Sequence, residues 1–379
     1  MRSLLQLFAA VASVAAVVAT VPASAQPTKA DTATEWKAVV AKATAFLKTK
    51  QDENGGWSTK TNPGVTGVVV TGLLECGVSP DDEPAASGLK YIEGLVNPKA
   101  RHIAGADPKV GLQNYVTSVN LMALVAAKRD AKYRPVISNA TAFLKNLQWD
   151  DGEGKTQKDD FYGGAGYDSK SRPDLSNTQF FLDALKSAGV PSDDPALKKA
   201  LIFVSRCQNL KTEHNDQPWA GEFNDGSFIY SAAAGGSTKT SDDPKAPLSG
   251  YGSMTYAGIK SMIYCGVGKD DPRLKKALEW ARKNYTLELN PGMPPQFAHR
   301  GLYYYYHTFA KTMDVLGVDQ FEDDKGVKHD WRADLVAALA KRQRSDGSWT
   351  NETDRWMEGD PNLVTGYTLM ALGHARPKK

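Results

Sequence analysis

Apolar residues recur at helical spacing in six similar segments of the chain. The two clearest copies run from Lys42 to Trp57 (KATAFLKTKQDENGGW) and from Asn139 to Gly154 (NATAFLKNLQWDDGEG). In the first copy Ala43, Phe46 and Leu47 fall on one side of a 3.6-residue helix. The other copies begin at Ser87, Lys199, Lys276 and Asp334. Each copy therefore predicts an amphipathic helix with one face against a core.

A second series of segments alternates with the first and is less charged and richer in small and aromatic residues. Its members cover 65–78, 115–127, 176–190, 253–267, 302–318 and 364–374. Threonines recur near their starts, at Thr66, Thr117, Thr178, Thr255 and Thr365, and glycines follow four of them, at Gly77, Gly189, Gly266 and Gly317. These residues are typical of helix caps and of glycines that end a helix. The second series predicts six inner helices.

Six amphipathic helices alternating with six more buried ones cannot each bury an apolar face alone. The pattern predicts an all-α fold, an (α/α)6 toroid in which six outer helices surround six inner ones, over residues 30–376. A two-layer solenoid is the alternative arrangement.

The N-terminus reads as an export signal. Arg2 precedes an apolar run from Leu4 to Val21, and Ala23-Ser24-Ala25 stands before Gln26. This pattern predicts a signal peptide over residues 1–25, cleaved after Ala25, and a periplasmic or secreted mature protein. No later stretch is long and apolar enough to predict a membrane span.

Charge and cysteine content narrow the classes of partner and site. Lys plus Arg number 46 against 43 Asp plus Glu, spread along the chain, so no nucleic-acid footprint is predicted. Cys76 and Cys265 occupy a position that holds Ala188 and Leu316 in other copies, and no Cys-x-x-Cys occurs. They predict small buried hydrophobes rather than a disulfide or metal site. The sequence leaves the oligomeric state open.

The first copy resembles the QW motif of squalene and hopene cyclases. The matching residues are Lys42, Ala43, Phe46, Leu47, Gln51, Gly55 and Trp57, and Gln343, Gly347 and Trp349 repeat the second half of the motif. The copy from Asn139 to Gly154, the third along the chain, keeps Gln148 and Gly152 but has Gly154 where Trp is expected. With the alternating helices, the resemblance extends over nearly the whole mature chain to the superfamily of terpene cyclases and protein prenyltransferase β-subunits, which are α/α toroids. Physically, Gln can bind backbone groups at a helix end, Gly permits the turn and Trp covers the joint.

The same resemblance implies where a cyclase would keep its acid. Class II terpene cyclases protonate an alkene with the middle Asp of a D-x-D-D-T motif, and DLSNT, from Asp174 to Thr178, falls at the corresponding place. Ser176 stands where the proton donor belongs and Asn177 where the next acid belongs, and neither supplies an acidic proton. Asp174 is either a remaining catalytic acid or a helix N-cap, and we favour the cap.

The prenyltransferase branch would require a zinc site of Asp, Cys and His. The segment 302–318 has no Asp-x-Cys, and Val364 or Thr365 stands where a His belongs. Asp194 and Asp271 each precede a proline, which predicts two more helix N-caps rather than metal ligands. We therefore predict no metal and no cofactor.

The densest group of candidate site residues is FAHRGLYYYYHTF. It contains His299, Arg300, four successive tyrosines and His307. Tyrosines at inner-helix starts should line a central cavity, and Arg300 and Trp219 are further ligand-binding candidates. The predicted lining tyrosines are Tyr115, Tyr251, Tyr256, Tyr303 and Tyr367. Asp174 and His307 are the catalytic candidates.

Three functions remain open at this point. The chain is a cyclase-like enzyme with a rearranged acid, a noncatalytic binder of an isoprenoid-like or other apolar small molecule, or a polysaccharide-active lyase or hydrolase. An enclosed aromatic cavity favours the first two, and an open cleft where His299, Arg300 and His307 converge favours the third. The insertion at 211–247 has the length to cover either kind of site.

Overall fold

The computed structural model describes residues 29–106 and 112–378, and helices dominate these ranges. The predicted signal peptide, 1–25, lies outside the described residues. The odd-numbered helices are α1 (Lys29–Lys50), α3 (Ala85–Gly94), α5 (Asp130–Lys145), α7 (Pro195–Arg206), α9 (Pro272–Lys283) and α11 (Trp331–Arg342). The even-numbered helices are α2 (Gly64–Glu75), α4 (Gln113–Ala126), α6 (Leu175–Ser187), α8 (Gly252–Tyr264), α10 (Leu302–Leu316) and α12 (Pro361–His374). The all-α prediction is confirmed.

Short elements complete the described chain. They are three 3-10 turns, η2 (Asp151–Glu153), η3 (Pro295–Phe297) and η4 (Arg355–Met357), and two strands, β1 (Phe321–Glu322) and β2 (Lys328–His329). The strands pair antiparallel, with Phe321 opposite His329.

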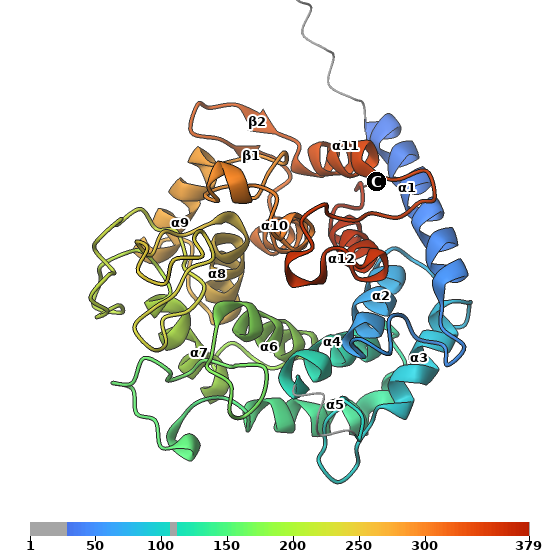
Figure 1. Cartoon of the computed structure of the whole chain (residues 1–379), viewed down its shortest axis with the longest axis horizontal. Coiled ribbons are helices and arrows are strands. Elements are labelled where there is room, and N and C mark those ends of the chain that lie inside the picture. The colour runs from blue at the N-terminus through green and yellow to red at the C-terminus, as the bar shows by residue number, and fades with distance from the viewer. Residues whose placement is uncertain (1–28, 107–111, 379) are drawn as a thin grey trace, which may run out of the picture.

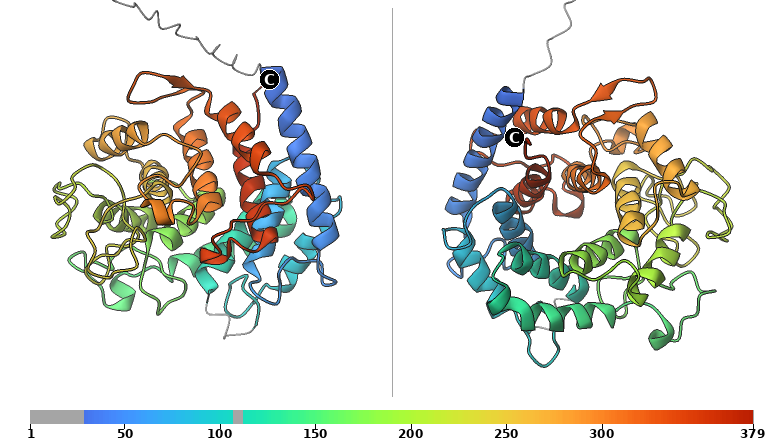
Figure 2. Two further views of the ribbon diagram at one scale, coloured as in Figure 1. Left: turned by 45° about the horizontal axis from the view of Figure 1, so that its top comes forward. Right: turned by 180° about the vertical axis from the view of Figure 1, so that it is seen from behind.

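The even-numbered helices surround the centre of the molecule, and the odd-numbered helices lie outside them (Figures 1 and 2). Each even-numbered helix packs against the next in chain order, and α12 packs against α2, which closes the row. Burial follows position: α4 is buried from Asn114 to Leu124, whereas α9 buries one side only. A closed row of this kind buries the apolar faces that an open solenoid would leave exposed at its ends.

Four glutamines join consecutive outer helices. Gln51 Nε2 donates to the carbonyls of Gly55 and Pro84, at 2.8 and 2.9 Å. The other three also donate to a loop glycine carbonyl and to a carbonyl of another outer helix. They are Gln148 (to Gly163 and Ala196), Gln208 (to Gly226 and Arg273) and Gln343 (to Gly347 and Val39). The Gln343 bond to Val39 joins α11 to α1, so the outer layer closes as the inner one does.

The recurring threonines do not cap their own helices, contrary to the sequence prediction. The hydroxyl oxygen of Thr66 instead accepts the backbone N–H of Trp57 at 3.0 Å. Four more threonine hydroxyls accept a backbone N–H in the same way: Thr117 from Ile103, Thr178 from Ala165, Thr255 from Phe228, and Thr365 from Trp349. Each threonine therefore fixes the loop that leads from an outer helix to the inner helix carrying it.

These bonds also correct the alignment of the third copy. Gly163, with φ +85°, takes the place of Gly55 (φ +86°) as the acceptor for the glutamine. Ala165, two residues later, takes the place of Trp57 as the donor to the threonine. The sequence prediction had assigned Gly152 and Gly154 to these places. Residues 149–162 form an extra loop, which shifts the motif along the chain.

Two buried cysteines and two helix caps have the roles that the sequence predicts. Cys76 and Cys265 are buried and free, as expected for packing residues. Asp194 and Asp271 cap α7 and α9 by accepting the backbone N–H groups of Ala196 and Arg273, and these two predictions are confirmed. Among the residues that the structure describes, no helix combines the length and the apolar character needed to cross a membrane.

Candidate functional site

A cavity of about 260 Å³ lies where the inner helices begin, and we call it the aromatic cavity. Residues in or just before the first turns of all six inner helices line it, among them Asn62 before α2 and Leu363 in α12. Loops supply Tyr167, Tyr230 and the segment Trp356–Glu358. Tyr167 and Trp356 are partly exposed, at 37% and 38%, so the cavity opens to solvent beside them.

Aromatic rings make up about half of the lining residues. They are Tyr115, Tyr167, Phe180, Tyr230, Tyr251, Tyr304, Trp356 and Tyr367. The hydroxyls of Tyr115 and Tyr367 lie 3.0 Å apart, and Tyr304 OH lies 3.0 Å from Ser176 Oγ. Burial raises the pKa of Tyr115 and Tyr304, so these phenols stay neutral. The walls combine apolar ring faces with a few hydroxyl groups, a composition suited to an apolar small molecule.

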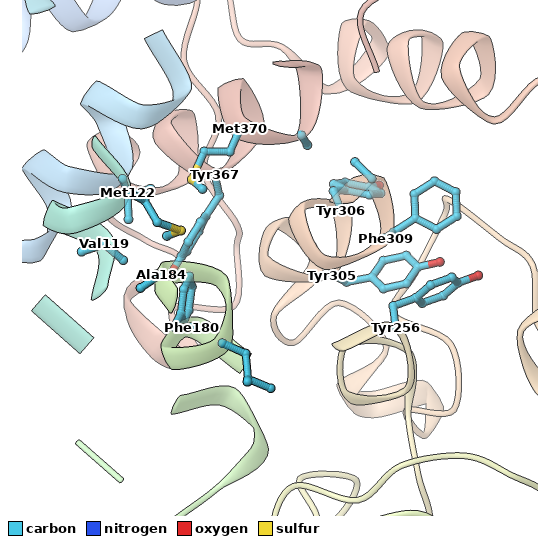
Figure 3. Packing of buried hydrophobic residues seen from close by; sticks show 14 of the residues in the cluster. Val119, Met122, Phe180, Ala184, Tyr256, Tyr305, Tyr306, Phe309, Tyr367 and Met370 are labelled. Atoms are coloured by element: carbon cyan, nitrogen blue, oxygen red, sulfur yellow. The ribbon is translucent and has the colours of Figure 1, made fainter. Parts of the chain in front are cut away.

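Three of the five predicted tyrosines line the aromatic cavity, namely Tyr115, Tyr251 and Tyr367. Two do not. Tyr256 packs against Tyr305 and Phe309, with ring centroids 5.7 and 5.2 Å away, apart from Phe180 and Tyr367 (Figure 3). Tyr303 packs edge-on against Tyr306, with centroids 5.7 Å apart.

Tyr304 is the member of the four-tyrosine run that lines the aromatic cavity. Successive residues of a helix point about 100° apart, so neighbouring tyrosines face different surroundings. The sequence identifies Tyr304 only as part of the run and Tyr230 only as part of the insertion at 211–247. Tyr167 is not among its candidates, because a loop tyrosine carries no helical spacing.

Asp174 caps α6 and is buried, with 3% of its surface exposed. Its carboxylate accepts the backbone N–H of Asn177 and the side-chain amide of the same residue, both at 2.8 Å. Burial raises the pKa of Asp174 to about 6, against these hydrogen bonds, which favour the charged form. The predicted cap is confirmed. Ser176 and Asn177, at the two positions of the missing acids, line the aromatic cavity.

Glu358 is the only charged side chain among the described residues that line the aromatic cavity, and sequence analysis did not identify it. It follows η4 and accepts the backbone N–H of Tyr304 at 2.8 Å and the side-chain amide of Asn351 at 2.6 Å. Burial raises its pKa to about 7 despite these bonds. An Asp or Glu in an irregular loop carries no sequence pattern that would have distinguished it.

His307, the other predicted catalytic residue, is fully buried and does not line the aromatic cavity. Its ring stacks on Phe180 and Tyr367, with centroids 5.9 and 5.7 Å away, and so lies behind the lining residues. Neither ring nitrogen has a hydrogen-bond partner among the described residues. Burial, and then the charges of Lys260 and Lys311, lower its pKa well below the usual value, so the ring is neutral.

A buried ionic group lies on the same side of the inner ring as His307. Asp183 of α6 binds Lys260 of α8 at 2.6 Å and Lys311 of α10 at 3.3 Å. Lys260 Nζ also donates to Gln179 Oε1 at 2.5 Å, and Gln179 donates to the hydroxyl of Tyr304 at 3.0 Å. Burial opposes the charge on Asp183, but the two lysines outweigh it and lower the pKa of Asp183 to about 2. The network therefore reaches from a buried ion triad to a hydroxyl in the cavity wall.

Trp219 and Arg300, the two other predicted ligand-binding residues, lie outside the aromatic cavity. Trp219 is buried in the insertion beside Gly236. Arg300 forms two bonds with Asp242, at 2.9 and 3.0 Å. Within residues 29–106 and 112–378, no three His, Cys, Asp or Glu side chains are grouped to hold a metal ion.

Comparison with solved structures shows which fold this is. No protein-family model matches the sequence, and comparison with curated proteins finds no match. An apo structure of a variant of the type II terpene cyclase MstE from Scytonema is similar over 91% of this chain and 98% of its own, with a TM-score of 0.57 and 13% identity. Two further MstE variants have TM-scores of 0.57 and 0.55 at 12% identity. The match to the first spans 91% of this chain and 99% of that variant, and the match to the second spans 91% of this chain and 98% of that variant. The chain shares the fold of this terpene cyclase.

Proposed function

We propose that the protein is an exported, cyclase-like (α/α)6 toroid that binds an isoprenoid-like or other apolar small molecule in the aromatic cavity. The observation that carries this proposal is the cavity itself, formed by the starts of six inner helices and lined by eight aromatic rings. Its volume of about 260 Å³ is at the small end of ligand sites, which favours a short isoprenoid over a triterpene.

The acid chemistry of a class II cyclase has no counterpart at the expected position. Ser176 occupies the place of the proton donor, and Asp174 is committed to the α6 cap and to Asn177. We therefore propose ligand binding as the function, with the cyclase acid lost. Aromatic walls of this kind bind an apolar ligand through ring faces without requiring a catalytic group.

The solved structures support the class of ligand. One MstE variant is a complex with geranylgeranyl dihydroxybenzoate, its substrate, and another is a complex with merosterolic acid A, its product. The polysaccharide alternative lacks the arrangement that it requires. His299 is exposed, Arg300 is paired with Asp242, and His307 is buried behind the cavity wall.

A cavity-filling variant tests the binding proposal. Ser176→Phe introduces a ring into the aromatic cavity, and Ser187→Phe makes the same change at the other end of α6. We expect farnesol to bind the wild type and Ser187→Phe, and Ser176→Phe to bind at least about tenfold more weakly because the cavity is filled. Equal binding of farnesol by all three proteins, measured by native mass spectrometry, would place the ligand elsewhere.

Export is tested separately. We expect protein recovered from an exporting host to begin at Gln26, because the small residues Ala23-Ser24-Ala25 provide the cleavage site. Intact-mass analysis decides this point. A recovered chain that begins at Met1 would contradict export.

A further inference from the structure

A second cavity, of about 430 Å³, adjoins the aromatic cavity and is lined by charged residues. Its cations are Arg172, Lys239, Arg300 and Arg355, against the two carboxylates of Asp242 and Asp243. We call it the basic cavity. Trp356 lines both cavities, and Lys239 Nζ lies 4.3 Å from the ring centroid of Tyr230, which lines the aromatic cavity. The two compartments therefore share a wall.

Three of the four cations form no ion pair with a described residue. Arg300 is paired with Asp242, but no ion pair to Arg172, Lys239 or Arg355 occurs among the described residues. Arg172 donates to Ser237 Oγ at 3.2 Å, and the Arg355 guanidinium lies 5.7 Å from the ring centroid of Trp356. Burial and then the charge of Arg172 lower the pKa of Lys239, and the carboxylates of Asp174 and Asp242 offset them only in part. Four cations against two carboxylates leave a net repulsion among the cations, and a bound anion would reduce it.

The shared wall is held in an unusual backbone conformation. Trp356 and the following Met357 both have positive φ, at 60° and 65°, which costs free energy for residues other than glycine. The Trp356 ring packs over Gly301, where a β-carbon would lie 3.1 Å from the ring. Strain of this kind persists where the surroundings fix a side chain in place, here between the two compartments.

The helix ends at this site also favour negative charge. The six inner helices all begin around the aromatic cavity, so their N-terminal ends, which carry partial positive charge, lie on this side of the ring. Asp174 and Glu358 already accept N–H groups at the starts of α6 and α10, so the charge available to a ligand comes chiefly from the four cations of the basic cavity, which face two carboxylates.

We propose that the basic cavity binds the anionic head group, a carboxylate or phosphate, of an amphiphilic ligand whose apolar tail lies in the aromatic cavity. The placement of the tail depends on the proposed function, whereas the head-group site is inferred from Arg172, Lys239 and Arg355. A guanidinium or ammonium donating to anionic oxygen makes a stronger hydrogen bond than a neutral pair does. The insertion at 211–247 supplies Lys239 and so contributes to the recognition of the head group.

Three probes with one farnesyl tail test this proposal by calorimetric titration: farnesol, farnesoic acid and farnesyl phosphate. We expect at least one of the two anions to bind about tenfold or more tightly than farnesol, since each charged hydrogen bond contributes that much. Tighter binding of farnesoic acid assigns a carboxylate site, and tighter binding of farnesyl phosphate assigns a phosphate site. Equal binding of all three would overturn the head-group site and leave the aromatic cavity as proposed.

Matched variants decide which residues act on the head group. Lys239→Met should weaken the anionic probes about tenfold and leave farnesol unchanged. The control is Lys245→Met, an exposed lysine of the same insertion that does not line the basic cavity. Asp242→Asn frees Arg300 and should tighten the anions. A loss of all three probes in Lys239→Met would contradict a charge-specific role.

Failure of the proposed function looks different. Methyl phosphate or acetate binding as tightly as the tailed anions, with no binding of farnesol, would keep the anion site and refute the apolar one. Absence of binding for every probe would refute both.

Discussion

At the scale of single residues, two buried carboxyls flank the aromatic cavity in different ways. Asp174 is held by Asn177 as a helix cap, and Glu358 lies at the start of α10 and lines the cavity. Burial raises the pKa of both, to about 6 and about 7. Their hydrogen bonds favour the charged forms, but removal from water outweighs them.

Asp174→Asn distinguishes a cap from a catalytic acid. Asparagine caps about as well as aspartate, so we expect the free energy of unfolding to change by less than ~1 kcal/mol. The buried Oδ1 of Asn177 has no partner among the described residues, so a rotated Asn177 amide can accept the new N–H group. Incubation of both proteins with squalene and shorter isoprenoids, analysed by gas chromatography, should give no cyclised product. Product from the wild type alone would restore the catalytic interpretation.

Glu358→Gln should alter the pH dependence of stability. The folded pKa of about 7 lies above the ordinary value of 4.5, so the native state holds the proton more tightly than the unfolded chain does. This contribution to stability is full at low pH and is lost as pH rises from about 4.5 to about 7. The full contribution of Glu358 to the free energy of unfolding is about 3 kcal/mol, since each unit of difference between the folded and unfolded pKa corresponds to about 1.4 kcal/mol.

Urea unfolding of wild type and Glu358→Gln at pH 5 and pH 8 measures this effect. The wild type should lose about 2–3 kcal/mol more than the variant does between the two pH values, because part of the contribution is already lost at pH 5. Asp174 is present in both proteins and contributes equally. Parallel losses in the two proteins would show that Glu358 ionises normally in the folded state.

At the scale of elements, the joints between helices share a small set of contacts. A glutamine at the end of an outer helix binds a glycine carbonyl and the next outer helix, and a threonine of the inner helix binds the N–H two residues after that glycine. The joint recurs at Gly163 and Ala165, where no Trp is present. The backbone contacts define the joint, and the Trp ring is an addition to it.

Gly163→Ala tests the importance of the joint. Gly163 has positive φ, and an added β-carbon would lie 1.8 Å from the carbonyl oxygen of Lys199 in α7. We expect a loss of about 3 kcal/mol or more, because strain and overpacking add. Gly154→Ala is the matched control, since Gly154 also has positive φ but has open space around it. Thermal unfolding should show that Gly154→Ala loses about 1 kcal/mol of unfolding free energy. Equal losses in both variants would indicate backbone strain alone.

At the scale of the whole molecule, closure is achieved in both layers. In the outer layer Gln343 of α11 binds α1, and in the inner layer α12 packs on α2. The ion triad of Asp183, Lys260 and Lys311 joins three consecutive inner helices, α6, α8 and α10. Contacts between residues far apart in the chain therefore hold the ring around the cavity.

Asp183→Asn should destabilise the whole ring. The substitution leaves two buried lysines without a counter-charge, which costs about 3–5 kcal/mol of unfolding free energy. The triple variant Asp183→Leu, Lys260→Met, Lys311→Met removes all three charges and should recover most of that loss. Urea unfolding measures both. A triple variant as unstable as Asp183→Asn would show that the triad contributes net stability through its own hydrogen bonds.

The sequence determined the helices and their alternation, because helical periodicity and end signals are local properties of the chain. It also determined the glutamine joints where no loop intervened, the caps at Asp174, Asp194 and Asp271, and the place of Tyr115, Tyr251 and Tyr367 in the cavity lining.

Only the tertiary structure decided which side chains meet at the site. It selected Tyr304 from four successive tyrosines, through the rotation of α10 about its axis, and it placed Glu358 of one loop at the start of that helix. It likewise brought Lys239, Arg172 and Arg355 from three separate segments into one cavity. Such groupings depend on packing between distant segments, and the pKa changes follow from the burial that this packing produces.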